Sequence, residues 1–575
     1  MLHRILEQRL RQAVSVALPD ADVTSVQVRP CPDPRFGDYQ ANALMGLAKA
    51  RKMNPRQLAT EVAAKLDVTE WCEKVEIAGA GFLNFRLKTA AIARALQETA
   101  ANRSKLVETT TQPRTVIVDF SSPNAAKPMH VGHIRSTILG DSLARTLRLL
   151  GHRVITDNHL GDWGTQFGKL IVGWKTHLDA GALACDPIAE MERLYKLINA
   201  ECERDPKTLA SARQELVKLQ GGDEENLQIW RKMIALSQSQ FDRVYGRLGV
   251  SFDHTFGESH YNSRLKTVVE ELTRLGLARE SEGAKAVFFE DVPELKGQPA
   301  LVQKSDGGFN YTTTDLATLQ FRWEGGCGGG SPDEIIYVTD GRQQLHFKQF
   351  FTLFRRWHPE ARVKLAHVWF GSILGEDGKP FKTRSGETVR LEDLLDEAEE
   401  RAFGVVSEKN PEWPEEKQRE IARIVGLGAI KYADLCQNRQ SDYVFNWDKM
   451  LSLQGNTAPY LLYAYTRIRS IFRKGSEETG VNSRLVLEAA EEIALARRLL
   501  DFGLVLETVA DEYRPNFLCS YLYELAGDFA RFYENCPVLK AEGDARASRL
   551  ALCDLTSRVL QQGLDSLGIR TTEQM

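Results

Sequence analysis

A strand, a polar loop and a helix follow one another between residues 115 and 150, and this order constrains the fold more than any other feature. Residues 115–120 are a short apolar run that contains Asp119. Residues 134–150 carry leucine and isoleucine at helical spacing and stop at Gly151, which is typical of a helix C-cap. Val154 and Ile155 then begin another strand. A strand–helix–strand order predicts an α/β fold with a parallel, Rossmann-type sheet and crossover helices.

Changes of pattern along the 575 residues predict several domains. Residues 1–108 mix helix with strand and predict a small α+β domain. Residues 109–400 predict the parallel-sheet domain, interrupted by a helical insertion at about 175–250. Residues 401–455 read as a helical connector, and residues 456–575 as an all-α C-terminal domain.

Composition narrows the class of protein without identifying a partner. The net charge of −4 argues neither for nor against a nucleic acid, because a small global charge can hide a basic face. Nine scattered cysteines without a C-x-x-C pair give no support to a zinc knuckle and suit a reducing cytosol. No run is apolar enough for a membrane helix. The N-terminal arginines leave a transit peptide open, but an apolar helical face there favours a folded, cytoplasmic protein.

The loop over residues 121–133 has the composition of a nucleotide site. It joins the carboxyl end of a strand to a helix N-terminus, where open α/β sheets bind ligands and free N–H groups favour phosphate. His130 and His133 can donate hydrogen bonds to phosphate oxygens, and Lys127 adds positive charge. Gly132 would let an adenine ring approach the backbone. The alternative is a surface loop whose two histidines only cap the helix.

Two further groups of residues suggest ligand binding when they are considered together with that loop. Residues 378–386 form a basic, glycine-bounded loop that could close over a triphosphate, or could simply be solvated. Acids, amides and a phenol elsewhere in the sheet domain would suit a guanidinium or ammonium group. Each has a structural alternative, such as Asp315 as a helix N-cap or Tyr311 as a core residue. The members of this second group are Asp119, Asn124, Tyr311, Asp315, Gln343, Gln344 and His346.

Together these segments resemble the class I aminoacyl-tRNA synthetases, and among them closely the arginyl-tRNA synthetase family. The loop over residues 121–133 resembles the extended "HIGH" signature of that family. The resemblance runs nearly from end to end. The other matching segments are residues 161–168 (GDWGTQFG), 312–317 (TTTDLA), 381–387 (FKTRSGE) and 456–460 (NTAPY).

The resemblance implies that the enzyme ligates L-arginine to tRNA(Arg) through an arginyl-adenylate, releasing AMP and pyrophosphate. It implies that ATP, with Mg²⁺ on its phosphates, is held by Lys127, His130, Gly132, His133 and His346. It implies that the arginine substrate is held by Asp119, Asn124, Tyr311, Asp315 and Gln343. No metal ligand of the protein itself is implied. A monomer is expected, and the family often needs bound tRNA to form the adenylate.

One signature of the class departs from the usual pattern. In the "KMSKS" segment Arg384 stands where the second lysine would be, and Phe381 where the first would be. Family members that lack this lysine carry one shortly before the first signature histidine instead, as Lys127 does. We therefore expect Lys127, His130, His133, Lys382 and Arg384 to be the catalytic set, with the role of Lys382 open.

The resemblance also implies where tRNA binds. The N-terminal domain of the family contacts the elbow of tRNA, and Asn84 and Phe85 match that region. The C-terminal helical domain resembles the anticodon-binding part, where Tyr460 and Arg467 combine aromatic and basic character suited to unstacked bases. The alternative is that such tyrosines pack in the core and the arginines are solvated.

Two other functions are consistent with parts of the pattern. A synthetase for another amino acid, or another H-x-G-H nucleotidyltransferase, would keep the histidine loop. The acids Asp119 and Asp315 speak against an apolar substrate. A non-catalytic tRNA-binding relative would keep the helical tail, but the intact histidines, Lys127 and the glycine-flanked loop speak against a decayed site.

Overall fold

The computed structural model describes residues 1–33, 35–102, 106–381, 389–475 and 484–575, which form two compact units. One unit comprises Thr111–Leu451, and the other combines Met1–Thr110 with Ser452–Met575. No helix within these described ranges is long and apolar enough to cross a membrane.

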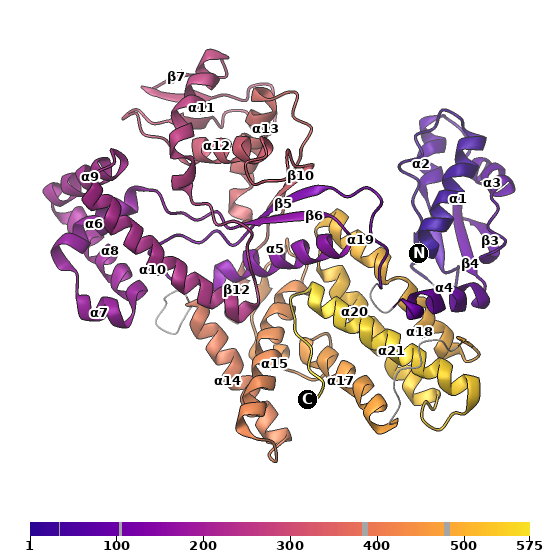
Figure 1. Cartoon of the computed structure of the whole chain (residues 1–575). Helices are drawn as coiled ribbons and strands as arrows, with labels where there is room; N and C mark the ends of the chain where they lie inside the picture. The colour runs from indigo at the N-terminus through magenta and orange to yellow at the C-terminus, as the bar shows by residue number, and fades with distance from the viewer. Residues whose placement is uncertain (34, 103–105, 382–388, 476–483) are drawn as a thin grey trace. The chain divides into compact units, whose positions relative to one another are not determined.

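A four-stranded parallel sheet lies at the centre of the Thr111–Leu451 unit (Figure 1). Its order is β11 (Lys364–His367), β10 (Glu334–Tyr337), β5 (Thr115–Asp119) and β6 (Arg153–Asp157). The register sets Asp119 beside Tyr337 on one side and Asp157 on the other. The carboxyl ends of adjacent strands therefore meet at one edge, and the predicted parallel α/β fold is confirmed.

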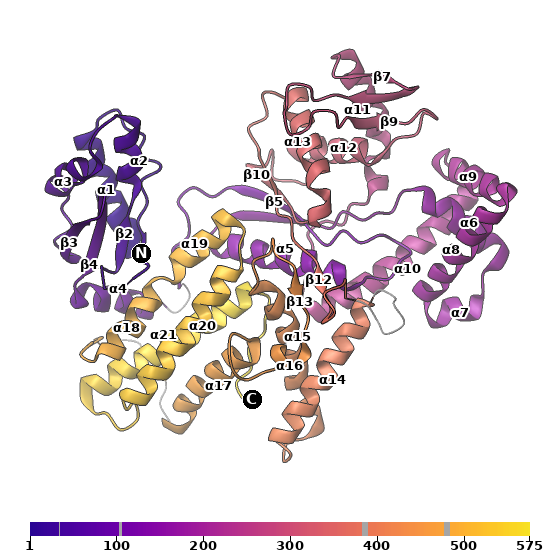
Figure 2. The same cartoon turned by 180° about the vertical axis from the view of Figure 1, so that it is seen from behind.

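Helices cover both faces of this sheet, as a crossover topology requires. Helix α5 (Val131–Leu149) lies on one face, and α12 (Tyr311–Trp323) and α13 (Gln344–Trp357) lie on the other (Figures 1 and 2). Gly140 allows α5 to approach closely, because a Cβ there would stand 2.1 Å from Cγ of Phe120. The packing thus fixes the start of α5 beside the end of β5.

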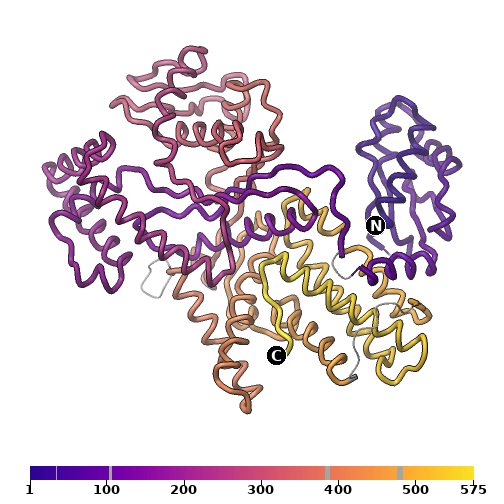
Figure 3. The backbone as a smooth tube through the Cα atoms, in the orientation of Figure 1, coloured from indigo at the N-terminus to yellow at the C-terminus, as the bar shows by residue number. Residues whose placement is uncertain are grey.

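Five helices between β6 and the next part of the unit form a lobe of their own (Figure 3). They occupy the stretch where a helical insertion was expected over 175–250. Aspartates cap four of them: Asp179, Asp186, Asp205 and Asp223 accept hydrogen bonds from the first-turn N–H groups. The helices are α6 (Thr165–His177), α7 (Ala180–Cys185), α8 (Pro187–Arg204), α9 (Pro206–Gln220) and α10 (Glu224–Leu248).

The rest of this unit completes the surroundings of the sheet. The unit also contains a small antiparallel sheet of order β7-β8-β9, which was not predicted from the sequence. Helices α14 and α15 pack on each other and on α5. Residues 401–451, expected as part of a separate connector, lie within the same unit as the parallel sheet. The remaining elements are η1 (Glu258–Tyr261), α11 (Asn262–Arg274), β7 (Ala278–Ser281), β8 (Ala284–Val287), β9 (Ala300–Gln303), η2 (Gly341–Gln343), β12 (Ile373–Leu374), α14 (Leu391–Lys409), α15 (Glu415–Leu435), β13 (Tyr443–Val444) and α16 (Trp447–Met450).

The other unit joins the two ends of the chain. An antiparallel sheet of order β1-β2-β4-β3 belongs to its N-terminal part, and five helices form its C-terminal part. The two parts are tied by an ion pair of 2.8 Å from Arg497 to Asp38 and by a hydrogen bond of 3.0 Å from the Tyr39 hydroxyl to Asp501. Its elements are α1 (Leu2–Ala17), β1 (Arg29–Pro30), β2 (Tyr39–Ala41), α2 (Ala43–Ala50), α3 (Pro55–Lys65), β3 (Cys72–Ala78), β4 (Phe82–Leu87), α4 (Thr89–Ala101), α17 (Ala458–Gly475), α18 (Ala490–Leu500), α19 (Phe502–Glu512), α20 (Asn516–Asn535) and α21 (Gly543–Ser566).

Candidate active site

The loop between β5 and α5 adopts a backbone that few side chains favour. Ser121, Ser122 and Ala126 have φ values of 74°, 50° and 61°, in the left-handed region. The surroundings hold this shape. The N–H of Ser121 donates to Oγ of Ser136 at 2.8 Å, and the N–H of Ser122 donates to Oδ1 of Asn158 at 3.0 Å. Left-handed non-glycine residues persist only where such contacts over-determine them, which is typical of functional loops.

The two histidines of this loop cap helix α5 with one nitrogen each. The N–H of Gly132 donates to Nδ1 of His130, and the N–H of His130 donates to Nδ1 of His133, both at 3.1 Å. Since each Nδ1 accepts, each neutral ring carries its proton on Nε2. The histidines therefore do cap the helix, and this capping is compatible with the ligand role, because it leaves one N–H donor on each ring.

Both histidines are neutral at physiological pH. Burial is the largest cause that lowers the pKa of His130, followed by the charges of Arg342 and Lys127. Burial, together with the charge of His130, lowers the pKa of His133 to about 3. Arg342 lies between β10 and α13 and was missed from the sequence. No local motif marks it, because only the fold brings the region after β10 close to the start of α5.

A side chain at Gly132 would disturb the protein itself, and not only the space expected for a nucleotide. A Cβ at this position would stand 2.9 Å from Cε1 of His130. A side chain here would therefore displace the ring that caps the helix. The neighbouring segment is fitted just as closely, since a Cβ on Gly161 would stand 2.2 Å from Oδ1 of Asn124.

Two of the residues expected to bind arginine, Tyr311 and Asp315, lie in the first turns of α12 beside His346 of α13, whereas Asn124 lies in the loop between β5 and α5 and pairs with Gly161. Nε2 of His346 lies 2.5 Å from Oδ2 of Asp315, and the Tyr311 ring lies edge-on 4.7 Å from the His346 ring. Tyr311 is 61% exposed, and Asn310 is the N-cap of α12, so the two structural alternatives for Tyr311 and Asp315 are wrong. His346, which was expected to hold ATP, therefore contacts Asp315 and Tyr311, two of the residues expected to bind arginine.

Glu258, in η1, is an acid that sequence reasoning missed. Burial, together with the nearby charges of Asp315 and Asp162, raises the pKa of its carboxyl to about 8. A lone glutamate between predicted elements gives no signal of this kind. Its place follows from the pairing of Leu160 with Gly257, which brings η1 beside the segment after β6. Two carboxyl groups that repel each other in this way suit a cationic ligand.

Asp119, expected as an open acceptor for arginine, already has a cationic partner. Nη2 of Arg322 lies 2.7 Å from Oδ2 of Asp119 and 2.6 Å from Oδ2 of Asp157. Arg322 is fully buried. Oδ1 of Asp119 accepts from the Ser122 hydroxyl at 3.0 Å. The negative charge of Asp119 is thus neutralised by Arg322, and its carboxylate holds the strained loop through Ser122.

The basic loop is anchored at both of its described ends. Lys382 and Arg384 lie outside the described residues. Before them, the N–H of Phe381 donates to the Ile373 carbonyl at 3.0 Å. After them, the N–H of Val131 donates to the Val389 carbonyl at 3.0 Å. The segment that follows the basic loop therefore pairs with the histidine loop itself.

The expected tRNA contact of Phe85 is wrong. Phe85 has no exposed surface, and its ring belongs to the core of the N-terminal part. Alternate residues of β4 face opposite sides of the sheet, so Asn84 lies on the other face. There Oδ1 of Asn84 accepts from Nε2 of Gln40 at 2.8 Å, and Phe82 shares that face. Asn84 is itself buried, with 3% of its surface exposed.

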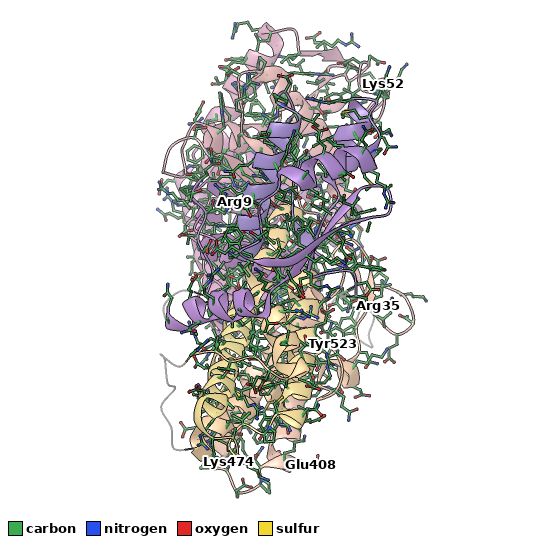
Figure 4. The ribbon with its side chains drawn as sticks, turned by 90° about the vertical axis from the view of Figure 1, so that its right-hand side faces the viewer. Arg9, Arg35, Lys52, Glu408, Lys474 and Tyr523 are labelled. Carbon is green, nitrogen blue, oxygen red and sulfur yellow. The ribbon has the colours of Figure 1, made fainter. Side chains whose placement is uncertain are left out.

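The C-terminal helices carry aromatic rings beside arginines. The rings of Tyr460 on α17 and Tyr523 on α20 lie 5.5 Å apart, and the Arg467 guanidinium lies 4.8 Å from the Tyr533 ring centroid. Tyr523 is 37% exposed, and Figure 4 shows it at the surface of the helical part. Tyr465, by contrast, is buried and fits the core alternative.

Metal-ligating side chains do not gather in the described part of the chain. No group of three or more histidine, cysteine, aspartate or glutamate residues there could hold a metal ion.

Family models match nearly the whole chain in three parts. The model for the catalytic domain of "tRNA synthetases class I (R)" matches residues 95–447. The "Arginyl tRNA synthetase N terminal domain" matches residues 3–87, and the "DALR anticodon binding domain" matches residues 461–575.

Relatives and solved structures agree with these matches. Arginine–tRNA ligase of Chromobacterium violaceum is 47% identical over 581 residues and covers all of both chains. That of Laribacter hongkongensis is 46% identical over 578 residues, 99% of this chain and all of its own. Arginyl-tRNA synthetases of Plasmodium falciparum and Thermus thermophilus have similar structures. Both have a TM-score of 0.83, cover all of this chain and 99% and 100% of their own, and are 30% and 27% identical.

Proposed function

This chain belongs to the arginyl-tRNA synthetases of class I, and from that premise we propose which residues hold arginine, ATP and tRNA. The enzyme ligates arginine to tRNA(Arg) through an arginyl-adenylate, with release of pyrophosphate and then AMP. The residue roles below are proposals, and the geometry of the loop between β5 and α5 supports them.

Asp315, Glu258 and Tyr311 are proposed to receive the guanidinium of arginine. Burial and then the repulsion from Asp315 and Asp162 raise the pKa of Glu258, and a cation that enters between the carboxyl groups relieves that repulsion. Asn124 and Gln343, both exposed, are proposed to take the amino-acid end. Asp119 is proposed to stabilise the loop between β5 and α5 through its ion pair with Arg322 and its hydrogen bond with Ser122.

His130 and His133 are proposed to donate Nε2–H to the phosphates of ATP, with Lys127 and Arg342 supplying positive charge. Neutral donors and fixed cations stabilise the charge that develops on the departing pyrophosphate. Gly132 leaves space beside them, and His346 links the ATP and arginine groups through Asp315. Lys382 and Arg384 are proposed to add charge from the basic loop. Mg²⁺ would be carried on the phosphates, with few protein ligands.

The tRNA is proposed to meet two surfaces of the other unit. One is the face of β4 on which Phe82 and Gln40 are partly exposed and the buried Asn84 holds Gln40 through its hydrogen bond. The second is the aromatic surface of α17 and α20, with Tyr460 and Arg467, where bases can stack and phosphates can pair. A monomeric state and a cytoplasmic location stay predictions.

Two variants separate the two halves of the proposed site. Lys127→Ala should lower the rate of adenylate formation by ~10²-fold or more, with tRNA affinity nearly unchanged, because it removes charge needed in the transition state. Asp315→Asn should instead raise mainly the KM for arginine. ATP–pyrophosphate exchange in the presence of tRNA measures both. A normal rate in Lys127→Ala would remove Lys127 from the mechanism.

A further inference from the structure

Helix α8 of the inserted lobe carries an aromatic ring that reaches the nucleotide loop. Nζ of Lys127 lies 5.1 Å from the centroid of the Tyr195 ring, and Nζ of Lys169 lies 5.9 Å from the same ring. Tyr195 is half-buried, whereas Lys127 is exposed. An exposed lysine samples many rotamers, and attraction to a fixed ring narrows that range.

The same helix also contacts Arg390, in the segment that follows the basic loop. Nη2 of Arg390 donates to Oε2 of Glu192 at 3.1 Å, and Nη1 lies 3.7 Å from Oδ2 of Asp186, the N-cap of α8. The backbone on either side of Arg390 is hydrogen-bonded to residues 129 and 131 of the histidine loop. Arg390 thus lies between α8 and the nucleotide loop.

These two contacts come from one face of one helix. Glu192 and Tyr195 are three residues apart, so their side chains are neighbours on α8. Tyr195 contacts the lysine that precedes the signature histidines, and Glu192 contacts Arg390, which follows the basic loop. A displacement of α8 would therefore move both cationic groups together.

We propose that α8 is a positioning element for adenylate formation, in which Tyr195 places the Lys127 ammonium and Glu192 places Arg390. Neither residue touches a substrate. The inference rests on the proposed role of Lys127 in ATP binding. It extends the active site to α8, which none of the signature segments includes.

A double-mutant cycle tests the link between Tyr195 and Lys127. Tyr195→Leu should lower the kcat of ATP–pyrophosphate exchange about 3- to 10-fold, with the KM for arginine unchanged. Tyr195→Phe, which keeps the ring, should restore most of the rate. Adding Tyr195→Leu to Lys127→Ala should cause little further loss, because the group that the ring positions is already absent.

Two companion variants complete the test: one is a control for a general effect on the lobe, and the other tests the contact of Glu192 with Arg390. Lys232→Ala removes another contact of the same kind in the lobe, an ammonium 5.5 Å from the Trp174 ring, and should leave exchange unchanged. Glu192→Gln should lower kcat about threefold through Arg390, again without changing the KM for arginine.

The outcomes separate the inference from the function on which it rests. A wild-type rate in Tyr195→Leu, or full additivity with Lys127→Ala, overturns the inference while Lys127 keeps its role. A wild-type rate in Lys127→Ala removes the role of Lys127 and the inference with it.

Discussion

At the scale of single residues, the site works by holding groups in the protonation state that a charged ligand needs. His130 and His133 are kept neutral by burial and by nearby cations, so they donate hydrogen bonds without adding charge. Glu258 is kept mostly protonated at neutral pH by burial and by Asp315. The proposed nucleotide side of the site therefore gathers cations, and the proposed arginine side gathers acids.

Arginine binding should release a proton at neutral pH. In the free enzyme the pKa of Glu258 is about 8, so its carboxyl is mostly protonated at neutral pH and ionises as the pH rises. A bound guanidinium favours the carboxylate, so the affinity for arginine should increase from mildly acidic to mildly alkaline pH. Calorimetry in buffers of different ionisation enthalpy measures the released proton. Glu258→Gln should abolish it, and an unchanged release in that variant would rule out Glu258 as its source.

At the scale of elements, the loop from β5 to α5 combines strain with close packing. Its left-handed residues are held by hydrogen bonds from other elements, and its histidines are held by the helix that they cap. Such a loop is pre-organised, and small displacements of its donors weaken the stabilisation of the transition state.

Gly132→Ala tests this requirement for close packing. The new Cβ would stand 2.9 Å from Cε1 of His130, so the ring must move. We expect exchange to slow by about tenfold or more, with tRNA affinity unchanged. Gly246→Ala, whose Cβ would meet nothing within 4 Å, is the matched control. Equal rates in the two variants would show that the position of the His130 ring does not limit the reaction.

The parts of the site that could be predicted are those that are local in sequence. Lys127, His130 and His133 follow one strand directly, so the strand–loop–helix order was enough to place them. Glu258 and Arg342 could not be found in this way, because they come from elements far along the chain that only the sheet topology brings near. The burial of Phe85 could not be predicted either, because residues 83–85 of β4 are all buried and only the packing of the N-terminal part covers both faces there.

At the scale of the whole molecule, the two ends of the chain form one compact unit. Contacts between its N-terminal and C-terminal parts include buried ionisable groups. The carboxyl of Asp501 accepts from the Tyr39 hydroxyl, and burial raises its pKa to about 7. The two parts are therefore expected to depend on each other for stability.

This group makes the stability of that unit depend on pH. Because the folded pKa of Asp501 lies above its ordinary value of 3.8, its contribution is complete below that value and is lost as the pH rises through about 7. Asp501→Asn should therefore unfold at a higher temperature than the wild type at mildly alkaline pH. The difference should be on the order of 1 kcal/mol for each unit of pKa shift. Thermal denaturation, with the exposed Asp20→Asn as a control, measures it. A lower melting temperature for Asp501→Asn at that pH would contradict this assignment.

The identity of the amino acid that is transferred tests the function most directly. Purified enzyme, ATP, Mg²⁺ and total tRNA are incubated with each of the amino acids in turn, and aminoacylated tRNA is measured. Paired acids at Asp315 and Glu258 and the family membership predict that arginine alone is attached, and only to tRNA(Arg). Attachment of any other amino acid, or none with arginine and tRNA both present, would contradict it.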